Sequence, residues 1–239
     1  MNLLVGVMTC HRLDYYFDEL TRDYIKTRCL DQQERVNTIR DTWLKELPEG
    51  VDYKFFYGTK FRVDKERRNP PPQPKLRDPL ADEVYLDCGD YYTENPAKMQ
   101  GICKYALDHG YDFLLRTDDD TFVYPDRLLK EDWAGFDYSG SSPVDFHPGG
   151  CMFLSRRAME IVVAGRPDYY ADDVWIGKVM RKSGIPMHHI ESIHNEWGKG
   201  YSVDPAAVGT NHSALHSCTP SVMRMLYARR NPAVRAAIM

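Results

Sequence analysis

Three features that would place the chain in a special class are missing from its 239 residues. No apolar run approaches the roughly 18 residues of a membrane-spanning helix, and the run at residues 3–8 is long enough only for a strand. Charge of one sign is not in excess: 31 Lys and Arg face 35 Asp and Glu, which argues against nucleic-acid binding. The six cysteines form no Cys-x-x-Cys pair, which argues against a structural zinc site. An ordinary globular composition remains, with 43% hydrophobic and 28% charged residues.

Hydrophobic periodicity predicts strands alternating with helices. We expect strands at residues 3–8, 51–57, 83–86, 111–116 and 151–154, and helices at residues 31–47, 95–110, 155–163 and 172–183. This alternation favours an α/β fold with a mostly parallel central sheet flanked by helices, which binds ligands at the carboxyl ends of its strands. The proline-rich segment 67–79 looks like a surface loop, so one domain spanning residues 1–239 is expected.

Three adjacent aspartates, Asp118, Asp119 and Asp120, follow the predicted strand 111–116. Like charges this close repel and raise one another's pKa, and a divalent cation removes that repulsion. In extended backbone residues i and i+2 face the same side, so Asp118 and Asp120 can share one cation while Asp119 points elsewhere. Oxygen ligands suit Mg²⁺ or Mn²⁺. An acidic turn that only solvates a loop explains the triplet alone about as well, but the buried strand before it favours the metal.

Six segments with recognisable motifs follow one another along the chain, at residues 35–43, 90–98, 113–128, 147–155, 172–177 and 215–217. The first reads Arg-x-x-x-Ile-Arg-x-Thr-Trp, the third contains the aspartate triplet, and the fifth reads Asp-Asp-Val-x-x-Gly. Together they resemble the β-1,3-galactosyltransferase and Fringe-like family of inverting glycosyltransferases. The six motifs stand in the same order as in that family, and the resemblance spans residues 3 to about 227.

The resemblance implies a GT-A fold, a UDP-sugar donor, a glycan acceptor and a Mn²⁺ (or Mg²⁺) ion held by Asp118, Asp120 and His216. Donor contacts are expected from Thr9, Arg35, Arg40, Lys98, Arg116, Asp118, Asp119, Gly149 and Gly150. Structural alternatives stay open: a tight turn for the glycines, a solvated helix face for the helix arginines, and a surface position for His216. Arg116 departs from the family, which often has lysine there, and a guanidinium places its donors differently from an ammonium.

Inverting transfer needs a base that takes the proton from the acceptor hydroxyl as it attacks. By the family motif Asp173 is the candidate, and Asp172 is the reserve. The alternative is that both aspartates only cap the helix predicted at residues 172–183. Trp197 lies in a polar, glycine-containing loop and is a candidate aromatic wall for the acceptor sugar, with core packing equally favoured.

The expected function is transfer of a hexose or N-acetylhexosamine, with galactose favoured, from a UDP-sugar to a glycan hydroxyl. Inversion would give a β linkage, with β-1,3 favoured. A non-catalytic sugar-nucleotide or glycan-binding protein would lack the base, and a metal-dependent phosphohydrolase would need a second acidic cluster. Since the chain begins two residues before its first predicted strand, we expect a cytoplasmic enzyme; a Golgi-lumenal domain with its anchor removed is the alternative. The acceptor and the oligomeric state do not follow from the sequence.

Overall fold

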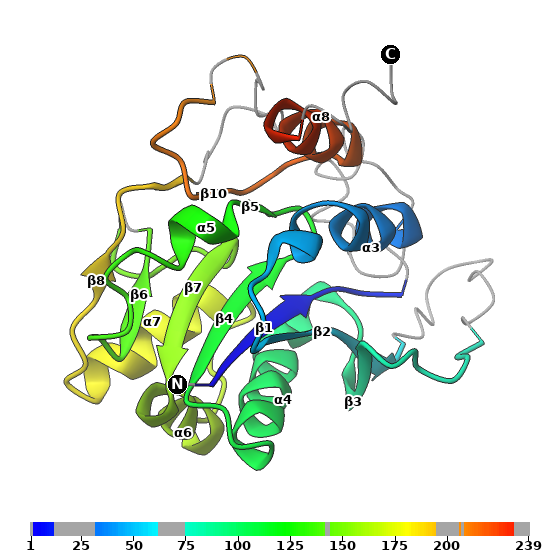
Figure 1. Ribbon diagram of the computed structural model, residues 1–239. Helices are drawn as coiled ribbons and strands as arrows, with labels where there is room; N and C mark the ends of the chain where they lie inside the picture. Colours follow the sequence, from blue (N-terminus) through cyan, green and yellow to red (C-terminus); the bar gives the residue numbers. More distant parts are fainter. Residues whose placement is uncertain are drawn as a thin grey trace.

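The structure is a computed structural model that describes residues 2–11, 32–61, 75–141, 144–194, 206 and 208–231. Its main sheet has seven strands in the order β3-β2-β1-β4-β7-β6-β8 (Figure 1). Their bounds are β1 (Leu3–Met8), β2 (Val51–Lys60), β3 (Glu83–Gly89), β4 (Phe113–Asp118), β6 (Tyr138–Gly140), β7 (Cys151–Ser155) and β8 (His188–His189). A second sheet has the order β5-β10-β9, with β5 (Phe122–Val123), β9 (Ile193–His194) and β10 (Ala214–Leu215).

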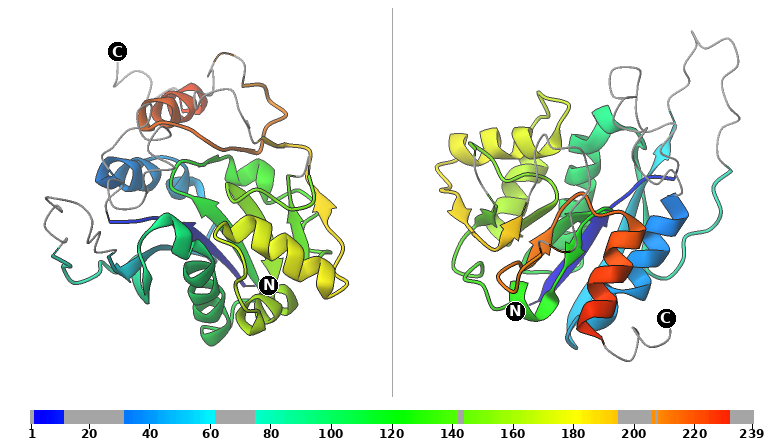
Figure 2. Two further views of the ribbon diagram at one scale, coloured as in Figure 1. Left: turned by 180° about the vertical axis from the view of Figure 1, so that it is seen from behind. Right: turned by 90° about the horizontal axis from the view of Figure 1, so that it is seen from above.

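The helices occupy both faces of the main sheet. They are α3 (Gln32–Asp41), α4 (Asn95–Asp108), α5 (Pro125–Leu128), α6 (Arg156–Ala164), α7 (Asp172–Lys182) and α8 (Pro220–Arg230), with 3-10 helices η1 (Trp43–Glu46) and η2 (Tyr92–Glu94). Helices α3 and α8 lie side by side over one face, and α4, α6 and α7 cover the other (Figures 1 and 2). None of the helices in the described ranges combines the length and apolar character needed to cross a bilayer.

The main sheet is mostly parallel, as the alternation of elements predicts. Strand β1 pairs in parallel with both β2 and β4, and β2 pairs in parallel with β3. Strand β6 pairs in parallel with β8, and β7 is antiparallel to both of its neighbours, β4 and β6. The expected α/β class with a mostly parallel central sheet is therefore confirmed.

Alternating side chains of β1 pack into two separate hydrophobic cores, because successive residues of a strand face opposite sides. Leu3, Val5 and Val7 pack in the cluster that contains the buried residues of α3 and α8. Leu4 and Met8 pack in the cluster that contains the buried residues of α4, α6 and α7. The strand is thus buried on both faces, as a central parallel strand requires.

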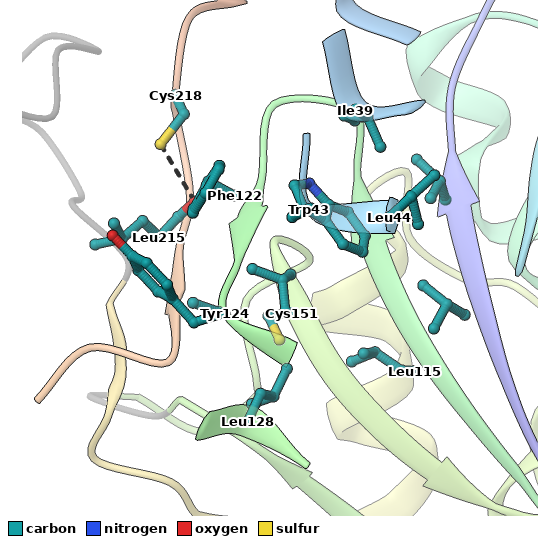
Figure 3. Close-up of a cluster of buried hydrophobic side chains, with 14 of the residues drawn as sticks. Ile39, Trp43, Leu44, Leu115, Phe122, Tyr124, Leu128, Cys151, Leu215 and Cys218 are labelled. Atoms are coloured by element: carbon teal, nitrogen blue, oxygen red, sulfur yellow. Dashed lines mark hydrogen bonds between the residues drawn. The ribbon is translucent and has the colours of Figure 1, made fainter. Parts of the chain in front are cut away.

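The helix predicted at residues 31–47 is divided: α3 ends at Asp41, and η1 covers Trp43–Glu46. Thr42 directs its hydroxyl back to the carbonyl oxygen of Thr38 at 2.7 Å, a contact that competes with regular helical bonding. The apolar side chains on both sides of this break nevertheless stay buried. Figure 3 shows Ile39, Trp43 and Leu44 packed in one core with side chains of β4, β7 and the second sheet.

Other helix ends follow the predictions with one exception. Ser155 caps α6, since its hydroxyl oxygen accepts a hydrogen bond from the Ala158 backbone N–H at 3.2 Å. Gly184 follows α7 with a φ of +68°, which glycine adopts without strain. The pair Asn95-Pro96 is typical of an N-cap followed by proline, but Asn95 is already helical and Glu94 occupies the cap position.

Candidate active site

Thr9 and the aspartate triplet, two of the predicted features, lie together at the carboxyl ends of β1 and β4. Met8 and Asp118 lie opposite each other in the parallel register, so Thr9 and the aspartate triplet leave neighbouring strands at the same edge. From β1 the chain runs through α3 to β2, whereas β4 is reached through α4 on the opposite face of the sheet. A reversal of this kind between two central strands opens a crevice at their carboxyl ends.

Asp118, Asp120 and His216 form a group that can hold a metal ion, with one ligand atom from each lying within 4.8 Å of the others. The imidazole Nε2 atom of His216 lies 3.1 Å from an Asp120 carboxylate oxygen and 3.5 Å from one of Asp118. His216 reaches the aspartates because Leu215 pairs with Phe122, just beyond the triplet. The Cys218 backbone N–H then donates to the Asp120 carbonyl oxygen at 2.8 Å. The tertiary structure thus joins residues almost a hundred positions apart.

The three candidate metal ligands and the charges around them suit a divalent cation. Burial raises the pKa of Asp118 to about 7; Arg116 and His216 oppose this, whereas Asp120 and Asp172 add to it. A bound cation would relieve this crowding of carboxylates, and two carboxylates with one imidazole suit Mn²⁺. A Cβ atom on Gly150 would lie 2.5 Å from the His216 ring carbon Cγ. The absent side chain at Gly150 therefore leaves the space that the imidazole fills.

Gly150→Ala is expected to weaken Mn²⁺ binding by at least about tenfold, because the new methyl group and the His216 ring cannot occupy the same space. Isothermal titration with MnCl₂ measures the affinity. Gly135→Ala is the matched control, since its Cβ would have no neighbour nearer than 3.6 Å. Equal Mn²⁺ affinity in the two variants would contradict a ligand role for His216.

Asp119 points away from the metal-binding group, toward β1 and α3. One carboxylate oxygen accepts a hydrogen bond from the Arg35 guanidinium at 2.9 Å. The other accepts from the Thr9 hydroxyl at 2.8 Å and from the Gln32 side-chain amide. Asp119, Arg35 and Thr9 are all buried. These contacts fix the backbone of the triplet and so aim Asp118 and Asp120 at His216.

Trp43 contacts the residue that follows the aspartate triplet, Thr121. Its ring is fully buried, and its indole N–H donates to the Thr121 carbonyl oxygen at 3.1 Å. Thr121 in turn donates its hydroxyl hydrogen to the Gly150 carbonyl oxygen at 2.8 Å. The segment 35–43 thus holds the aspartate loop from both sides, through Arg35 at one end and Trp43 at the other.

Lys98 and Asp90 form a buried ion pair beside the carboxyl end of β1. The Lys98 ammonium lies 2.8 Å from an Asp90 carboxylate oxygen and donates to the Thr9 carbonyl oxygen at 2.7 Å. Burial lowers the pKa of Lys98, but the groups around it, with Asp90 first among them, outweigh burial, so the net pKa is raised. Asp90 also accepts from the backbone N–H groups of His11 and Gly58. Lys98 and Asp90 thus connect the end of β1, through Thr9, to Gly58 of β2.

Lys98→Met is expected to lower the free energy of unfolding by about 3–5 kcal/mol, because it leaves the buried Asp90 carboxylate without its cation. Urea denaturation followed by circular dichroism gives the difference. Lys104→Met, which breaks an exposed ion pair with Asp108 on the same helix, is the control and should cost about 0.5 kcal/mol or less. A Lys98 variant as stable as this control would show that the buried pair adds little to the fold.

Arg116 connects the metal-binding group to the start of α7. One guanidinium nitrogen lies 2.9 Å from an Asp118 oxygen and 3.0 Å from an Asp172 oxygen. The side chain is almost completely buried, and a Cβ on Gly149 would lie 2.4 Å from its Nη1 atom. Gly149 is therefore needed because the arginine passes directly against its backbone.

Asp172 and Asp173 begin α7, as predicted, but their surroundings differ. Asp172 is buried and paired with Arg116. Asp173 is half-buried, and its carboxylate accepts from the backbone N–H groups of Gly149, at 3.2 Å, and Val174. Burial and the neighbouring Asp172 raise the pKa of Asp173 to about 6. Asp173 is therefore the more accessible of the two carboxylates.

Arg40 lies away from the other residues that were predicted to contact the sugar donor. Its guanidinium donates to Asp82 at 2.7 Å and to Glu83 at 2.9 Å, at the start of β3, and lies over the Phe55 ring. The helical spacing explains this, because residues five apart on α3 point in different directions. Trp197, the candidate acceptor wall, lies outside the described residues.

Two residues near the site, Gln32 and Tyr92, were not predicted from the sequence. Gln32 donates to both Thr9 and Asp119, and a polar residue in the first turn of a helix gives no sign of such a role. Tyr92 lies in η2, and burial raises the pKa of its phenol, with further contributions from the charges of Asp172, Asp173 and Asp118. Its place in the motif segment 90–98 is the one signal that points to it.

The Galactosyltransferase family model matches residues 34–132 of the chain. The matched region contains Arg35, Lys98, Arg116 and the aspartate triplet, and it ends before α7 and His216. The expected resemblance to galactosyltransferases is thereby confirmed, and the match supports a glycosyltransferase. No curated protein matches the chain by sequence.

Several solved structures resemble the chain. A provisionally assigned nucleotide-diphospho-sugar transferase from Desulfovibrio desulfuricans G20 is 13% identical with a TM-score of 0.45, covering 80% of each chain. The catalytic domain of Drosophila beta1,4-galactosyltransferase 7, in complex with xylobiose, is 13% identical with a TM-score of 0.44, covering 90% of this chain and 71% of that one. A Pyrobaculum calidifontis mannosyltransferase in complex with GDP-Man and Mn²⁺ is 14% identical with a TM-score of 0.39, covering 79% and 54%. Likenesses this weak carry no information about the substrate.

Proposed function

We propose that the chain is a metal-dependent, inverting glycosyltransferase of GT-A type. It transfers a hexose or N-acetylhexosamine, with galactose favoured, from a UDP-sugar to a glycan hydroxyl. The match of residues 34–132 to the Galactosyltransferase family supports the reaction class. The β linkage, with β-1,3 favoured, rests on the resemblance of the six sequence motifs.

The observation that carries the proposal is the approach of a metal-binding group to a separate, accessible carboxylate. Gly149 donates its N–H to Asp173, and the next residue, Gly150, packs against His216. Arg116 makes a second connection, between Asp118 and Asp172. A Mn²⁺ ion held by Asp118, Asp120 and His216 would stabilise the negative charge of the departing diphosphate. Residues for donor activation and for proton removal thus border one site.

Asp173 supplies the base in this proposal. The acceptor oxygen forms a bond to the anomeric carbon of the donor, the bond from that carbon to the diphosphate oxygen breaks, and its electron pair leaves with UDP. The hydroxyl proton passes to the Asp173 carboxylate. Asp172 is less suited to this role because it is buried and paired with Arg116.

A panel of UDP-sugars, incubated with the protein, Mn²⁺ and free saccharides, tests the proposal. Saccharide-dependent UDP release is the expected result. UDP release that needs no acceptor would instead indicate a hydrolase, and measurable donor binding without turnover would indicate a binding protein. Chelation with EDTA should abolish the release, and added Mn²⁺ should restore it.

The pH dependence of kcat/KM follows from the environment of Asp173. Since the base must be ionised and its pKa is raised to about 6, activity should rise as pH increases through about 6. Asp172→Asn removes a neighbouring charge that raises this pKa, so it should move the acid limb to lower pH. Initial rates between pH 4.5 and 8 measure both profiles. An acid limb in Asp172→Asn that stays in place or moves up would contradict the assignment of that limb to Asp173.

A further inference from the structure

Two neighbouring tyrosines, Tyr169 and Tyr170, are exposed immediately before α7. Tyr169 is 38% exposed and Tyr170 is 50% exposed. Over the parts of the chain that the structure describes, they are the only aromatic members of the exposed large hydrophobic residues, the others being Leu76, Leu80, Val144 and Met225. An exposed aromatic pair next to a candidate active site calls for a functional explanation, because apolar surface gathered in one place marks a binding site.

The two rings are held in place by specific contacts. They stack with a centroid distance of 4.6 Å and an interplanar angle of 27°. The Tyr92 ring lies 6.0 Å from that of Tyr170, and the Lys178 ammonium lies 4.8 Å from the Tyr169 centroid. Tyr92, Tyr169 and Tyr170 therefore form one aromatic surface, here named the tyrosine patch.

The tyrosine patch borders the carboxylates of the candidate active site. Tyr170 is two residues before Asp172 and three before Asp173 along the chain. Tyr92 comes from a different element, η2, and its ring centroid lies 6.0 Å from that of Tyr170. Segments from two parts of the fold thus place aromatic rings beside the proposed base.

We propose that the tyrosine patch is the acceptor subsite, and that it binds a saccharide by stacking its rings against the C–H face of a pyranose. This inference rests on the proposed function. The C–H face of a sugar is apolar, so it packs against the face of a tyrosine ring. A sugar seated there places a hydroxyl close to Asp173, as proton removal requires.

The exposure of the rings separates this role from a purely structural one. A residue that stabilises the fold by burial leaves little surface to solvent, whereas Tyr170 is half exposed. Replacing such a ring is expected to leave the melting temperature within a few degrees of the parent protein. Loss of acceptor affinity without loss of stability is therefore the signature of the subsite.

Steady-state kinetics of the Mn²⁺-loaded protein test the inference. The acceptors are the methyl glycosides of galactose, glucose, N-acetylglucosamine and xylose, because a methyl aglycone has no ring of its own to stack. Tyr170→Ala should raise the acceptor KM by about 2–10-fold and leave the donor KM unchanged, since one aromatic contact is lost. Tyr170→Phe keeps the ring and should retain the parent KM. Met225→Ala, an exposed site on α8, is the matched control.

The outcomes distinguish the inference from the proposed function on which it rests. If the parent protein transfers sugar to a methyl glycoside but Tyr170→Ala and a Tyr169→Ala/Tyr170→Ala double variant keep the parent acceptor KM, the subsite assignment is overturned alone. Transfer to a serine-containing peptide and to none of the glycosides would also overturn it. No transfer to any acceptor would overturn the proposed function, and the subsite with it.

Discussion

Asp173→Asn is expected to lower the turnover of sugar transfer by about 10²–10⁴-fold while donor affinity stays near that of the parent protein. Asparagine keeps the size of the side chain, and its single oxygen can accept one of the two hydrogen bonds that Gly149 and Val174 donate to separate carboxylate oxygens. It cannot take up a proton near neutral pH. The loss should therefore fall on kcat. Initial rates of UDP release measure kcat, and titration with UDP in the presence of Mn²⁺ measures donor binding.

Asp168→Asn is the matched control, because Asp168 lies four residues before Asp172 and is half exposed, 3.7 Å from Lys178. It should retain the parent kcat. Transfer by Asp173→Asn at the parent rate would refute the assignment of the base. If Asp172→Asn were inactive in that case, the reserve assignment would replace it.

Asp120→Ala is expected to weaken both Mn²⁺ binding and Mn²⁺-dependent UDP binding, by more than the 10–100-fold typical of losing an outer contact to a metal ligand. Asp120 is buried and lies 3.1 Å from His216, so its removal takes a carboxylate from the centre of the metal-binding group. Electron paramagnetic resonance of free Mn²⁺ measures the metal affinity directly. Titration calorimetry then gives UDP affinity with and without the metal.

Asp132→Ala, an exposed aspartate away from the triplet, controls for the loss of one negative charge. The melting temperature of Asp120→Ala should not fall, since removing one of several crowded carboxylates relieves repulsion. Mn²⁺ affinity equal to that of the control would refute the metal site. A reduced Mn²⁺ affinity with unchanged UDP binding would separate the metal from donor recognition.

Much of the fold can be read from local patterns. The run of apolar residues at positions 3–8 becomes β1 with the predicted bounds, and Ser155 caps α6. Patterns fail where a tertiary contact or a local side-chain bond competes with them. Thr42 bonds back to Thr38 where the helix gives way to η1, and β2 runs on past Gly58 because its pairing with β3 continues.

The sequence predicts individual residues of the site, but not which distant residues contact one another. The spacing of Asp118 and Asp120 indicates a shared cation, and the structure places them together with Asp119 turned away. The sequence alone does not distinguish Arg35, which meets Asp119, from Arg40, which meets Asp82 and Glu83. Nor does it indicate that Tyr92 and Tyr170, far apart along the chain, share one surface.

The sequence by itself determined the alternation of strands and helices and the placement of an aspartate triplet at the end of a buried strand, because periodicity and charge act over a few residues. Only the tertiary structure decided that His216 meets Asp118 and Asp120 and that Arg116 connects Asp118 to Asp172. Such contacts depend on strand order and on space left by Gly149 and Gly150. They follow from the packing of distant segments, which no local pattern encodes.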